Sequence, residues 1–205
     1  MANGTACVMW FLPVLLDVAG TETDWCPGGK WTPMSLDEFC YRRACCGAKP
    51  YCFLMNTDFH YFTHEMVEKY MKRSGVFGMF PSFFSADAAT QHYFKQPDLY
   101  ERDRPLFKKY MPIIKKVAEE GWEPITKAVS SEKYIHLERF GERYITLLNT
   151  RSDIPAEGVV TLYLNHASEV VDEYTGNVYP VDNHGIQIHL GPEDCAVLNL
   201  FPGAE

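Results

Sequence analysis

The amino-acid sequence predicts an α/β domain followed by a small all-β domain. In the first half, three apolar runs each lead into a polar loop and then a helical pattern, which is typical of parallel strands joined by helical crossovers. After Trp122 the chain changes to short alternating runs separated by glycine and proline, which predicts a small antiparallel β-sandwich. We place the boundary near Ala128, which gives an α/β domain over residues 1–128 and a β-sandwich over residues 129–205.

The three predicted strands of the α/β domain all end in polar residues. They are Leu12–Leu16, which runs into Asp17, then Pro50–Asp58, and then Val76–Ser85. Parallel strands present their carboxyl ends at one edge of a sheet, and α/β proteins hold their ligands there. The sequence therefore predicts a shared site built from the residues that end these strands.

Helical patterns follow each of these strands. Ser35 and Glu38 have the spacing of a capping box, which predicts a helix over Leu36–Cys46. A second helix is expected over His64–Arg73, and a short one over Ala88–Phe94. A third long helix, Pro105–Glu120, has an apolar face at helical spacing, and Pro112 inside it should produce a kink.

Six short alternating runs predict the strands of the second domain. They are Tyr134–Phe140, Tyr144–Asn149, Val159–Asn165, Val170–Tyr174, Ile186–Leu190 and Ala196–Leu200. Residues 174–177 read Tyr-Thr-Gly-Asn and predict a hairpin turn.

The composition is that of an ordinary globular protein, with 46% hydrophobic and 22% charged residues among 205. The net charge is −8, which argues against nucleic acid or an anionic membrane as the main partner. No run is long and apolar enough to span a bilayer. The aromatic content of 14% suits both protein cores and the faces of sugars.

Seven cysteines are present, an odd number without a CxxC pair, which favours free thiols in a reducing compartment over a zinc site. One disulfide involving Cys26 is the alternative. The apolar stretch Ala6–Leu16 lacks a preceding basic segment, contains Pro13 and runs into Asp17, so we do not expect a secretory signal. We therefore expect a cytoplasmic protein.

Several short motifs resemble those of a known group of proteins. In chain order they are Asp17–Glu22, Lys49–Asp58, Phe80–Ser85, Tyr100–Pro105, Gly121–Pro124 and Glu138–Gly141. Together they resemble the C-terminal part of large microbial glycoside-hydrolase-like proteins, which have a (β/α)₈ barrel and an appended β-sandwich. The resemblance covers nearly the whole chain, and it implies that the α/β domain is a partial barrel-like unit of about three β-α repeats.

A complete barrel needs eight strands and about 250 residues, so this sequence has room for only part of one. The chain is then either a fragment of a longer protein or a short form. A short form must cover its exposed parallel edge, by homo-oligomerisation or with a partner chain that completes the barrel.

Three carboxylates are the candidate catalytic residues. Glycoside hydrolysis generally needs one carboxyl group to give a proton and another to act as nucleophile or base. Asp17, Glu22 and Asp58 lie at or just past the predicted strand ends, and their separate roles stay open. The alternative is that Asp17 caps a turn and that Glu22 is a solvated loop acid.

Five further residues are candidates for substrate binding. The rings of Trp25, Trp31, Tyr61 and Phe84 can stack on the apolar face of a sugar, although packing in the core or a loop explains them equally well. Asn56 can bind a hydroxyl group or the neighbouring backbone.

Other motifs give weaker signals. His60 and His64 lack the HExxH pattern, so we expect no metal site there, and no cofactor motif is present. Ser82 and Ser85 lack the G-x-S-x-G context of serine hydrolases. Residues 102–104, Arg-Asp-Arg, should cap the long helix and pair charges.

These observations lead to two functional hypotheses. The first is a glycoside hydrolase-like protein, or a C-terminal fragment of one, that acts on glycosidic bonds through paired carboxylates. The second is a non-catalytic carbohydrate-binding or structural remnant of a barrel. The first predicts carbohydrate as the partner, and the second predicts carbohydrate binding or none. Neither predicts nucleic acid or a membrane as a partner.

Overall fold

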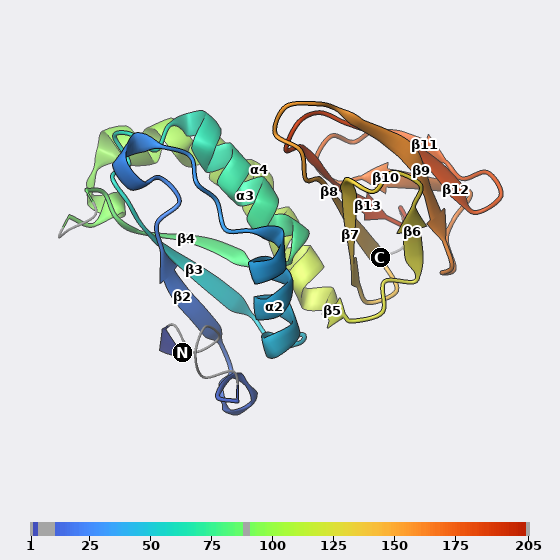
Figure 1. Cartoon of the computed structure of the whole chain (residues 1–205), viewed down its shortest axis with the longest axis horizontal. Helices are drawn as coiled ribbons and strands as arrows, with labels where there is room; N and C mark the ends of the chain where they lie inside the picture. Colours follow the sequence, from blue (N-terminus) through green and yellow to red (C-terminus); the bar gives the residue numbers. More distant parts are fainter. Residues whose placement is uncertain (1, 4–10, 88–90, 204–205) are drawn as a thin grey trace. The chain divides into compact units, whose positions relative to one another are not determined.

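The computed structural model of the protein describes residues 2–3, 11–87 and 91–203. It divides the chain into two compact units, Met1–Lys115 and Lys116–Glu205 (Figure 1). This division lies inside a helix, whereas the boundary expected from the sequence, near Ala128, falls later in the chain.

The first unit contains a parallel sheet whose spatial order follows the chain order. Its strands are β1 (Ala2–Asn3), β2 (Ala19–Thr23), β3 (Tyr51–Asn56) and β4 (Phe80–Ser85). Helix α2 (Leu36–Cys46) joins β2 to β3, α3 (His64–Val76) joins β3 to β4, and α4 (Pro97–Glu120) follows β4. The predicted alternation of strands and helices is therefore present.

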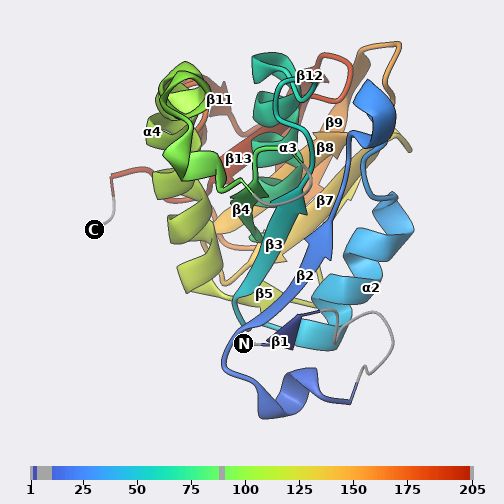
Figure 2. The ribbon, with the colours of Figure 1, turned by 90° about the vertical axis from the view of Figure 1, so that its left-hand side faces the viewer.

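All three helices cover the same face of this sheet (Figures 1 and 2). The ring of Phe53 lies 5.5 Å from Phe39 of α2 and 6.3 Å from Tyr70 of α3. Phe83 lies 4.9 Å from Phe107 of α4, and its register partner is Met55, two residues after Phe53. Because side chains alternate along a strand, Phe53 and Phe83 share a face and the opposite face carries none of these helices.

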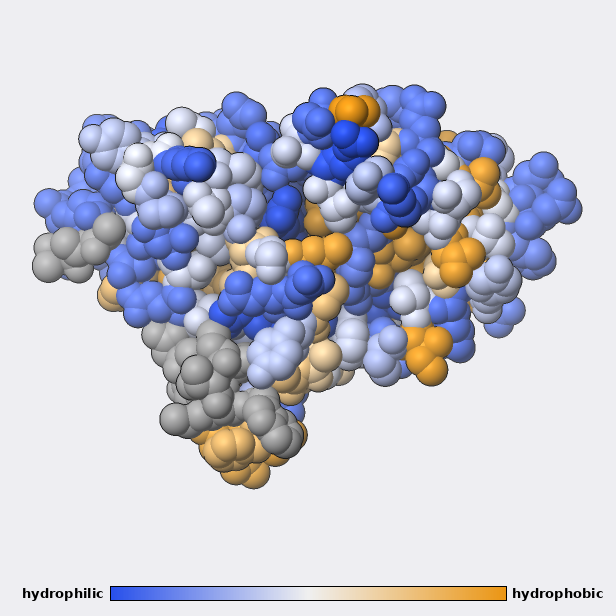
Figure 3. Space-filling view, in the orientation of Figure 1, coloured by the Kyte–Doolittle hydropathy of each residue, from blue (hydrophilic) through white to orange (hydrophobic). Residues whose placement is uncertain are grey.

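The expected first strand, Leu12–Leu16, is wrong. Pro13–Leu15 forms a 3₁₀ turn, and Val14 and Leu15 are 68% and 77% exposed. The loop before β2, at the lower edge of Figure 1, has an apolar surface in Figure 3. Pro13 has no N–H group to donate to a strand ladder. The strand begins at Ala19 instead, and it pairs with β3 from Ala19 opposite Tyr51 onward.

Local capping sets the starts of α2 and α3. The hydroxyl of Ser35 accepts a hydrogen bond of 3.2 Å from the amide of Glu38, as the capping box predicts. Gly47 follows α2 with a φ of 57°, a conformation that glycine adopts without a side-chain clash. The hydroxyl of Thr63 accepts from the amide of Met66 at the start of α3, which continues through Gly75 to Val76.

Helix α4 begins eight residues before the start expected at Pro105, since it opens at Pro97. Pro105 and Pro112 both lie inside it and both are exposed. Two turns separate them, so the carbonyl groups that they leave without an N–H partner face water on one side of the helix. Residues 88–90 of the expected short helix lie outside the described residues, and Tyr93–Lys95 forms a 3₁₀ turn.

The second unit consists of two antiparallel sheets. The six-stranded sheet has the order β11-β10-β13-β8-β7-β5, and the three-stranded sheet has the order β12-β9-β6. The strands are β5 (Trp122–Glu123), β6 (Ala128–Ser130), β7 (Ile135–Phe140), β8 (Tyr144–Asn149), β9 (Ala156–Leu162), β10 (Glu169–Asp172), β11 (Val178–Pro180), β12 (Gly185–Leu190) and β13 (Cys195–Asn199). The six expected strands are present, and the three missed ones are only two or three residues long.

One hydrophobic core lies between these sheets. Ile145, Leu147 and Leu198 of the larger sheet pack with Val160 and Ile186 of the smaller one. A carboxylate fixes the expected hairpin beside this core. Asp172 accepts hydrogen bonds from the amide of Val197 at 2.9 Å and from the hydroxyl of Thr175 at 2.6 Å.

Two motifs of the sequence resemblance pair with each other in this unit. Trp122 lies opposite Phe140, and Glu123 lies opposite Arg139, in the ladder of β5 and β7. The indole N–H of Trp122 donates to Glu138 at 2.5 Å, and Arg139 forms an ion pair of 3.1 Å with Glu123. The two motifs therefore fasten a short edge strand to its neighbour.

Among the six cysteines that the structure describes, no disulfide is formed. The expected alternative of a disulfide at Cys26 is wrong, because its sulfur lies 3.8 Å from the sulfur of Met66 instead. Among the described residues, none of the helices combines the length and the apolar character needed to cross a bilayer.

Candidate functional site

Polar side chains gather at the carboxyl ends of β2, β3 and β4. In the parallel register Glu22 lies opposite Leu54, and Asn56 lies opposite Ser85. Strand alternation places Glu22, Leu54 and Asn56 on the face that the helices leave open, because Phe53 and Met55 point toward the helices. Glu22 is exposed and Asn56 is half-buried, so this edge is accessible within the unit.

A hydrogen bond joins the first two strands at this edge. The side-chain amide of Asn56 donates to Oε1 of Glu22 at 2.6 Å. The amide oxygen of Asn56 is buried and accepts no hydrogen bond from any residue that the structure describes. The bond fixes the direction of the Glu22 carboxylate, while its exposed position leaves the group open to a ligand.

Asp58 follows directly beyond β3. Its Oδ1 accepts a hydrogen bond of 2.9 Å from the amide of His60, and its carbonyl accepts from Tyr61 and Phe62 at 3.0 Å each. One carboxyl oxygen therefore stabilises the turn that leads toward α3. The other, Oδ2, accepts no hydrogen bond within the described part of the chain.

Asp87 is a residue of this edge that the sequence analysis missed. It forms an antiparallel bridge with Asp58, and the amide of Phe59 donates to the carbonyl of Ala86 at 2.9 Å. Residues directly opposite in such a bridge have Cα atoms about 4.5–5.5 Å apart. The carboxylate of Asp87 also accepts from the hydroxyl of Ser85 at 3.1 Å. The available signal was an acid two residues after the predicted end of the third strand.

The pKa of a buried thiol, Cys26, indicates that the carboxylates of Asp24 and Asp58 lie near it. Asp24 accepts a hydrogen bond of 2.8 Å from the amide of Cys26. The pKa of the Cys26 thiol is raised, first by its burial and then by the negative charges of Asp24 and Asp58. Both carboxylates therefore act on Cys26, and the thiol stays protonated near neutral pH, which removes it as a nucleophile.

Asp17 lies at the other end of β2. It is exposed and precedes the strand, whereas Glu22 lies within it near the carboxyl end. Five residues of extended chain span roughly 16 Å. The expectation that Asp17 follows a strand and joins Glu22 and Asp58 is therefore wrong in its geometry, because the strand begins after Asp17.

Trp25 is a core residue. It is 1% exposed, and its ring makes edge contacts with Phe53 at 5.4 Å and with Tyr70 at 4.9 Å. A sugar cannot reach this ring, so the expected stacking role is wrong and the alternative of core packing holds. Trp31 is half-buried and packs against Phe62 at 6.0 Å.

Tyr61 and Phe84 are the exposed members of the aromatic candidates, at 62% and 46%. Tyr61 lies over Gly29, where a β-carbon would meet the tyrosine side chain at 3.7 Å. Phe84 lines a groove of about 440 Å³ that includes residues of β4 and α4. The lining residues are Leu54, Pro81, Ser82, Phe83, Phe84, His92, Phe94, Phe107 and Met111.

A buried ionic network connects α3 with α4. Asp103 is fully buried, and it lies 3.0 Å from Nδ1 of His64 and 2.7 Å from the guanidinium of Arg102. The hydroxyl of Tyr93 donates to Asp103 at 2.8 Å, and burial followed by the charge of Asp103 raises the pKa of Tyr93 far above its ordinary value. His60 precedes α3. Residues 102 and 103 thus pair charges inside α4, and they do not cap it.

No protein-family model matches the chain, and no curated protein matches it. Solved structures do match in fold. An α-galactosidase I from Mortierella vinacea aligns with 92% of this chain at 11% identity and a TM-score of 0.51. An α-amylase from Geobacillus thermoleovorans aligns with 95% of the chain at 9% identity and a TM-score of 0.46. An α-fucosidase from Thermotoga maritima aligns with 73% at 11% identity and a TM-score of 0.40.

The likeness to the α-galactosidase shows a shared fold over most of this chain. The chain spans 54% of the length of that enzyme. It also spans 42% of the amylase and 39% of the fucosidase. The chain is therefore similar in fold to part of a glycoside hydrolase, over about half of the length of such an enzyme.

Proposed function

We propose that this chain is the C-terminal part of a glycoside hydrolase-like protein that acts on glycosidic bonds through paired carboxylates. The observation that carries the proposal is the position of Glu22 and Asp58. They lie at the carboxyl ends of two neighbouring parallel strands, and Asn56 holds the first of them in place. Glycoside hydrolysis uses such a pair of carboxyl groups around the scissile bond.

The arrangement of the first unit supports a barrel origin. Its strands follow one another in chain order, and every helix packs on the same face. A doubly wound sheet places helices on both faces, whereas a barrel keeps them all outside. The face with Glu22 and Asn56 then corresponds to the barrel interior, and the two antiparallel sheets correspond to an appended β-sandwich.

In this proposal the two carboxylates have different roles. Glu22 serves as nucleophile or base, because the Asn56 amide orients a carboxylate that accepts hydrogen bonds. Asp58 serves as proton donor through Oδ2, with Asp87 beside it. Tyr61 and Phe84 supply exposed rings for the sugar.

The site also draws on chain beyond these strands. Among the described residues β1 and β4 are the outer strands of the parallel sheet. Further strands from a longer chain, a second copy or a partner chain would complete the barrel around the sugar. We also propose a reducing, cytoplasmic location, which the cysteine pattern of the sequence predicts.

A second candidate is a non-catalytic carbohydrate-binding or structural remnant of a barrel. The specific observation in its favour is that one carboxyl oxygen of Asp58 accepts a hydrogen bond from the amide of His60 and so stabilises the turn after β3. Such a remnant either binds sugar without hydrolysing it or has a structural role alone.

Hydrolysis of 4-nitrophenyl glycosides tests the proposal, with the α- and β-anomers of the galactoside and of the glucoside as probes. We expect turnover of at least one, and a loss of about 10²- to 10⁴-fold in kcat/KM for Glu22→Gln and for Asp58→Asn. Asp37→Asn, at an exposed carboxylate in the first turn of α2, should retain the activity. Rescue of a Glu22→Gly variant by azide would assign Glu22 as the nucleophile.

The outcomes separate the two candidates. Saturable binding of the free sugars without turnover, weakened in Glu22→Gln, would establish the non-catalytic reading. Neither turnover nor binding of any of the probes would overturn the proposed site. The native mass, measured by light scattering, would show whether a second copy is present.

A further inference from the structure

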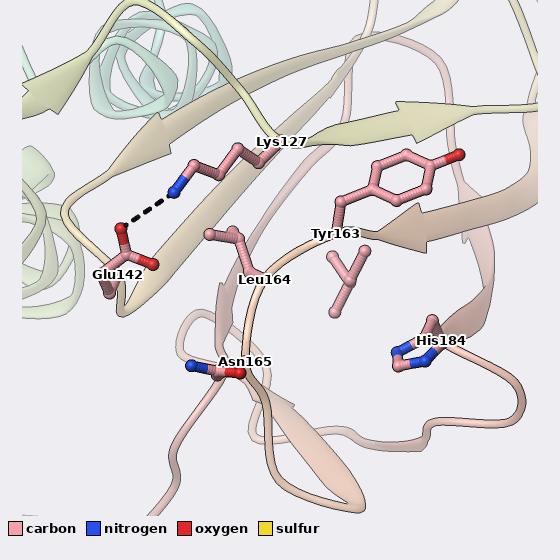
Figure 4. A pocket seen from close by; sticks show the side chains of 7 residues that line it. Lys127, Glu142, Tyr163, Leu164, Asn165 and His184 are labelled. Atoms are coloured by element: carbon pink, nitrogen blue, oxygen red, sulfur yellow. Dashed lines mark hydrogen bonds and ion pairs between the residues drawn. The ribbon is translucent and has the colours of Figure 1, made fainter.

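A hollow in the second unit has the features of a ligand site. Its volume is about 410 Å³, and it is lined by Lys127, Glu142, Leu162, Tyr163, Leu164, Asn165 and His184 (Figure 4). All these residues belong to the second unit, so the hollow is separate from the strand ends that carry Glu22 and Asp58. Nothing in the proposed hydrolysis uses it.

The floor is apolar and its frame is fixed by backbone hydrogen bonds. Leu162 and Leu164 are buried, whereas Tyr163 between them is 66% exposed. The amide of Leu162 donates to the carbonyl of His184, and the amide of Tyr163 donates to the carbonyl of Lys127, both at 2.8 Å. Lys127 and His184 have φ values of 49° and 64°, an unfavourable conformation that these bonds hold in place.

One side of the hollow carries an ion pair with unused hydrogen-bonding capacity. Nζ of Lys127 lies 3.5 Å from Oε1 of Glu142, and Arg139 approaches the same oxygen at 2.9 Å. Both hydrogen bonds fall on Oε1, and within the described residues Oε2 of Glu142 accepts no hydrogen bond. Lys127 therefore offers donors and Glu142 offers an acceptor at the same rim.

The other side carries a pair of histidines whose tautomers the backbone sets. Nδ1 of His166 lies 2.8 Å from the carbonyl oxygen of Ala167, which only accepts, so this nitrogen carries the proton. In the neutral pair, Nε2 of His166 then accepts from Nδ1 of His184 at 2.9 Å. Nε2 of His184 consequently keeps its lone pair and is a hydrogen-bond acceptor.

We propose that this hollow binds a neutral oligosaccharide, with Tyr163 as the stacking platform and Lys127, Glu142 and His184 as partners of its hydroxyl groups. A sugar hydroxyl both donates and accepts, which matches a rim that offers both capacities. A carboxylate or phosphate ligand would meet the acceptor oxygen of Glu142, and a cation would meet Lys127. An exposed tyrosine above a buried aliphatic floor provides the flat apolar surface that a pyranose ring packs on.

Figure 4 shows the side chains of Lys127, Tyr163 and His184 around the hollow. They come from positions far apart in the sequence. The antiparallel pairing of β9 with β6 and with β12 brings their loops together. The site is thus carried by a rigid two-sheet frame and needs no strand from outside the unit.

Isothermal titration calorimetry on the full chain tests the proposal with maltotriose, cellotriose, raffinose and the anionic trisaccharide trigalacturonate. We expect saturable binding of at least one neutral trisaccharide and weaker or no binding of trigalacturonate. Tyr163→Ala should weaken that binding by at least tenfold, and Lys127→Met should weaken it as well. Tyr41→Ala, at another exposed tyrosine, should leave it unchanged.

Two further variants separate this site from the proposed catalytic one. Glu22→Gln should reduce turnover of the aryl glycosides by about 10²-fold or more and leave trisaccharide binding intact. If Tyr61→Ala removes the binding while Tyr163→Ala does not, the sugar occupies the strand ends and the proposal is overturned. It is also overturned if none of the neutral trisaccharides binds, or if trigalacturonate binds more tightly than they do. Because Tyr163 is exposed, its replacement should leave the melting temperature unchanged.

Discussion

The two faces of the parallel sheet differ sharply along a single strand. In β3, Tyr51, Phe53 and Met55 face the helices and are fully buried. Leu54 and Asn56 alternate with them and are only half-buried on the opposite face. Adjacent residues of one strand therefore lie in two different environments.

The two faces differ in what they contribute, since the covered face stabilises the fold and the open face is suited to recognition. The covered face is packed with rings, since Phe53 contacts Trp25, Phe39 and Tyr70. The open face combines an apolar side chain, Leu54, with the hydrogen-bonded pair of Glu22 and Asn56. A face of this composition suits contact with a ligand or with further strands, whereas the covered face supplies the folding energy.

Truncation of one residue on each face tests this comparison most strongly. Phe53→Ala should lower the free energy of unfolding by about 3–5 kcal/mol, because it leaves a cavity in a fully buried aromatic cluster. Leu54→Ala on the open face should cost less than about 1.5 kcal/mol, since the side chain is already half in water. Urea unfolding followed by tryptophan fluorescence measures both, and equal losses would refute the comparison.

Replacement of the buried carboxylate of Asp103, in α4, should give the next largest loss of stability. Asp103→Asn removes the charge that pairs with Arg102 and one of the two carboxyl oxygens that accept from it, while the carbonyls of Phe59 and Phe62 still accept. We expect a loss of about 3 kcal/mol in urea unfolding. Glu101→Gln, in an exposed ion pair with Arg104, is the matched control and should change stability by less than about 0.5 kcal/mol.

Alkaline pH should weaken the covered face. Burial raises the pKa of Tyr70 well above its ordinary value, and its hydroxyl donates to the carbonyl of Ser82. Below pH about 10 both folded and unfolded chains keep the proton, so the full stability is present. Above that pH the unfolded chain releases the proton first, and stability falls as pH rises.

The Tyr70→Phe variant isolates this contribution. Its alkaline slope of unfolding free energy should be shallower than that of the unmodified chain, by a difference that grows through pH 10 toward about 1.4 kcal/mol per pH unit. Urea unfolding at a series of pH values between 9 and 11 gives both slopes. An unchanged slope would mean that Tyr70 titrates alike in the folded and unfolded chains.

The smallest effect concerns reactivity and leaves stability unchanged. Burial and the charges of Asp24 and Asp58 raise the pKa of Cys26, so its thiolate fraction at pH 8 is low. We expect iodoacetamide to modify Cys26 at least tenfold more slowly in the folded chain than in urea, as measured by peptide mass spectrometry. Modification at equal rates would place Cys26 away from the two carboxylates.

Local signals made much of the fold predictable. The hydroxyls of Ser35 and Thr63 cap helices where short-range patterns place them. Apolar runs identified β3 and β4, and alternation identified six strands of the second unit. The prediction of the first strand was wrong because the bulky apolar run at Leu12–Leu16 has a stronger strand pattern than Ala19–Thr23. The segment Ala19–Thr23 forms a strand through its pairing with β3. The early start of α4 was missed because Pro105 is tolerated on its solvent side.

The candidate site was predictable in part. Glu22, Asn56 and Asp58 were expected near one another, and the structure brings them to one edge. The position of Asp87 beside Asp58 results from an isolated bridge between two loops, and such a bridge leaves no pattern in the sequence. Trp25 shows that residue type alone does not distinguish a core ring from a platform for sugar. The hollow at Tyr163 likewise joins loops that only the sheet pairing brings together.

The most direct test of the central claim compares the two acids at opposite ends of β2. Glu22→Gln and Asp17→Asn each replace one exposed carboxylate by its amide, and kcat/KM for the 4-nitrophenyl glycosides measures the consequence. We expect Glu22→Gln to reduce the rate by about 10²-fold or more and Asp17→Asn to leave it within a factor of about two. A large loss in Asp17→Asn with full activity in Glu22→Gln would place the function at the wrong end of the sheet and contradict the account.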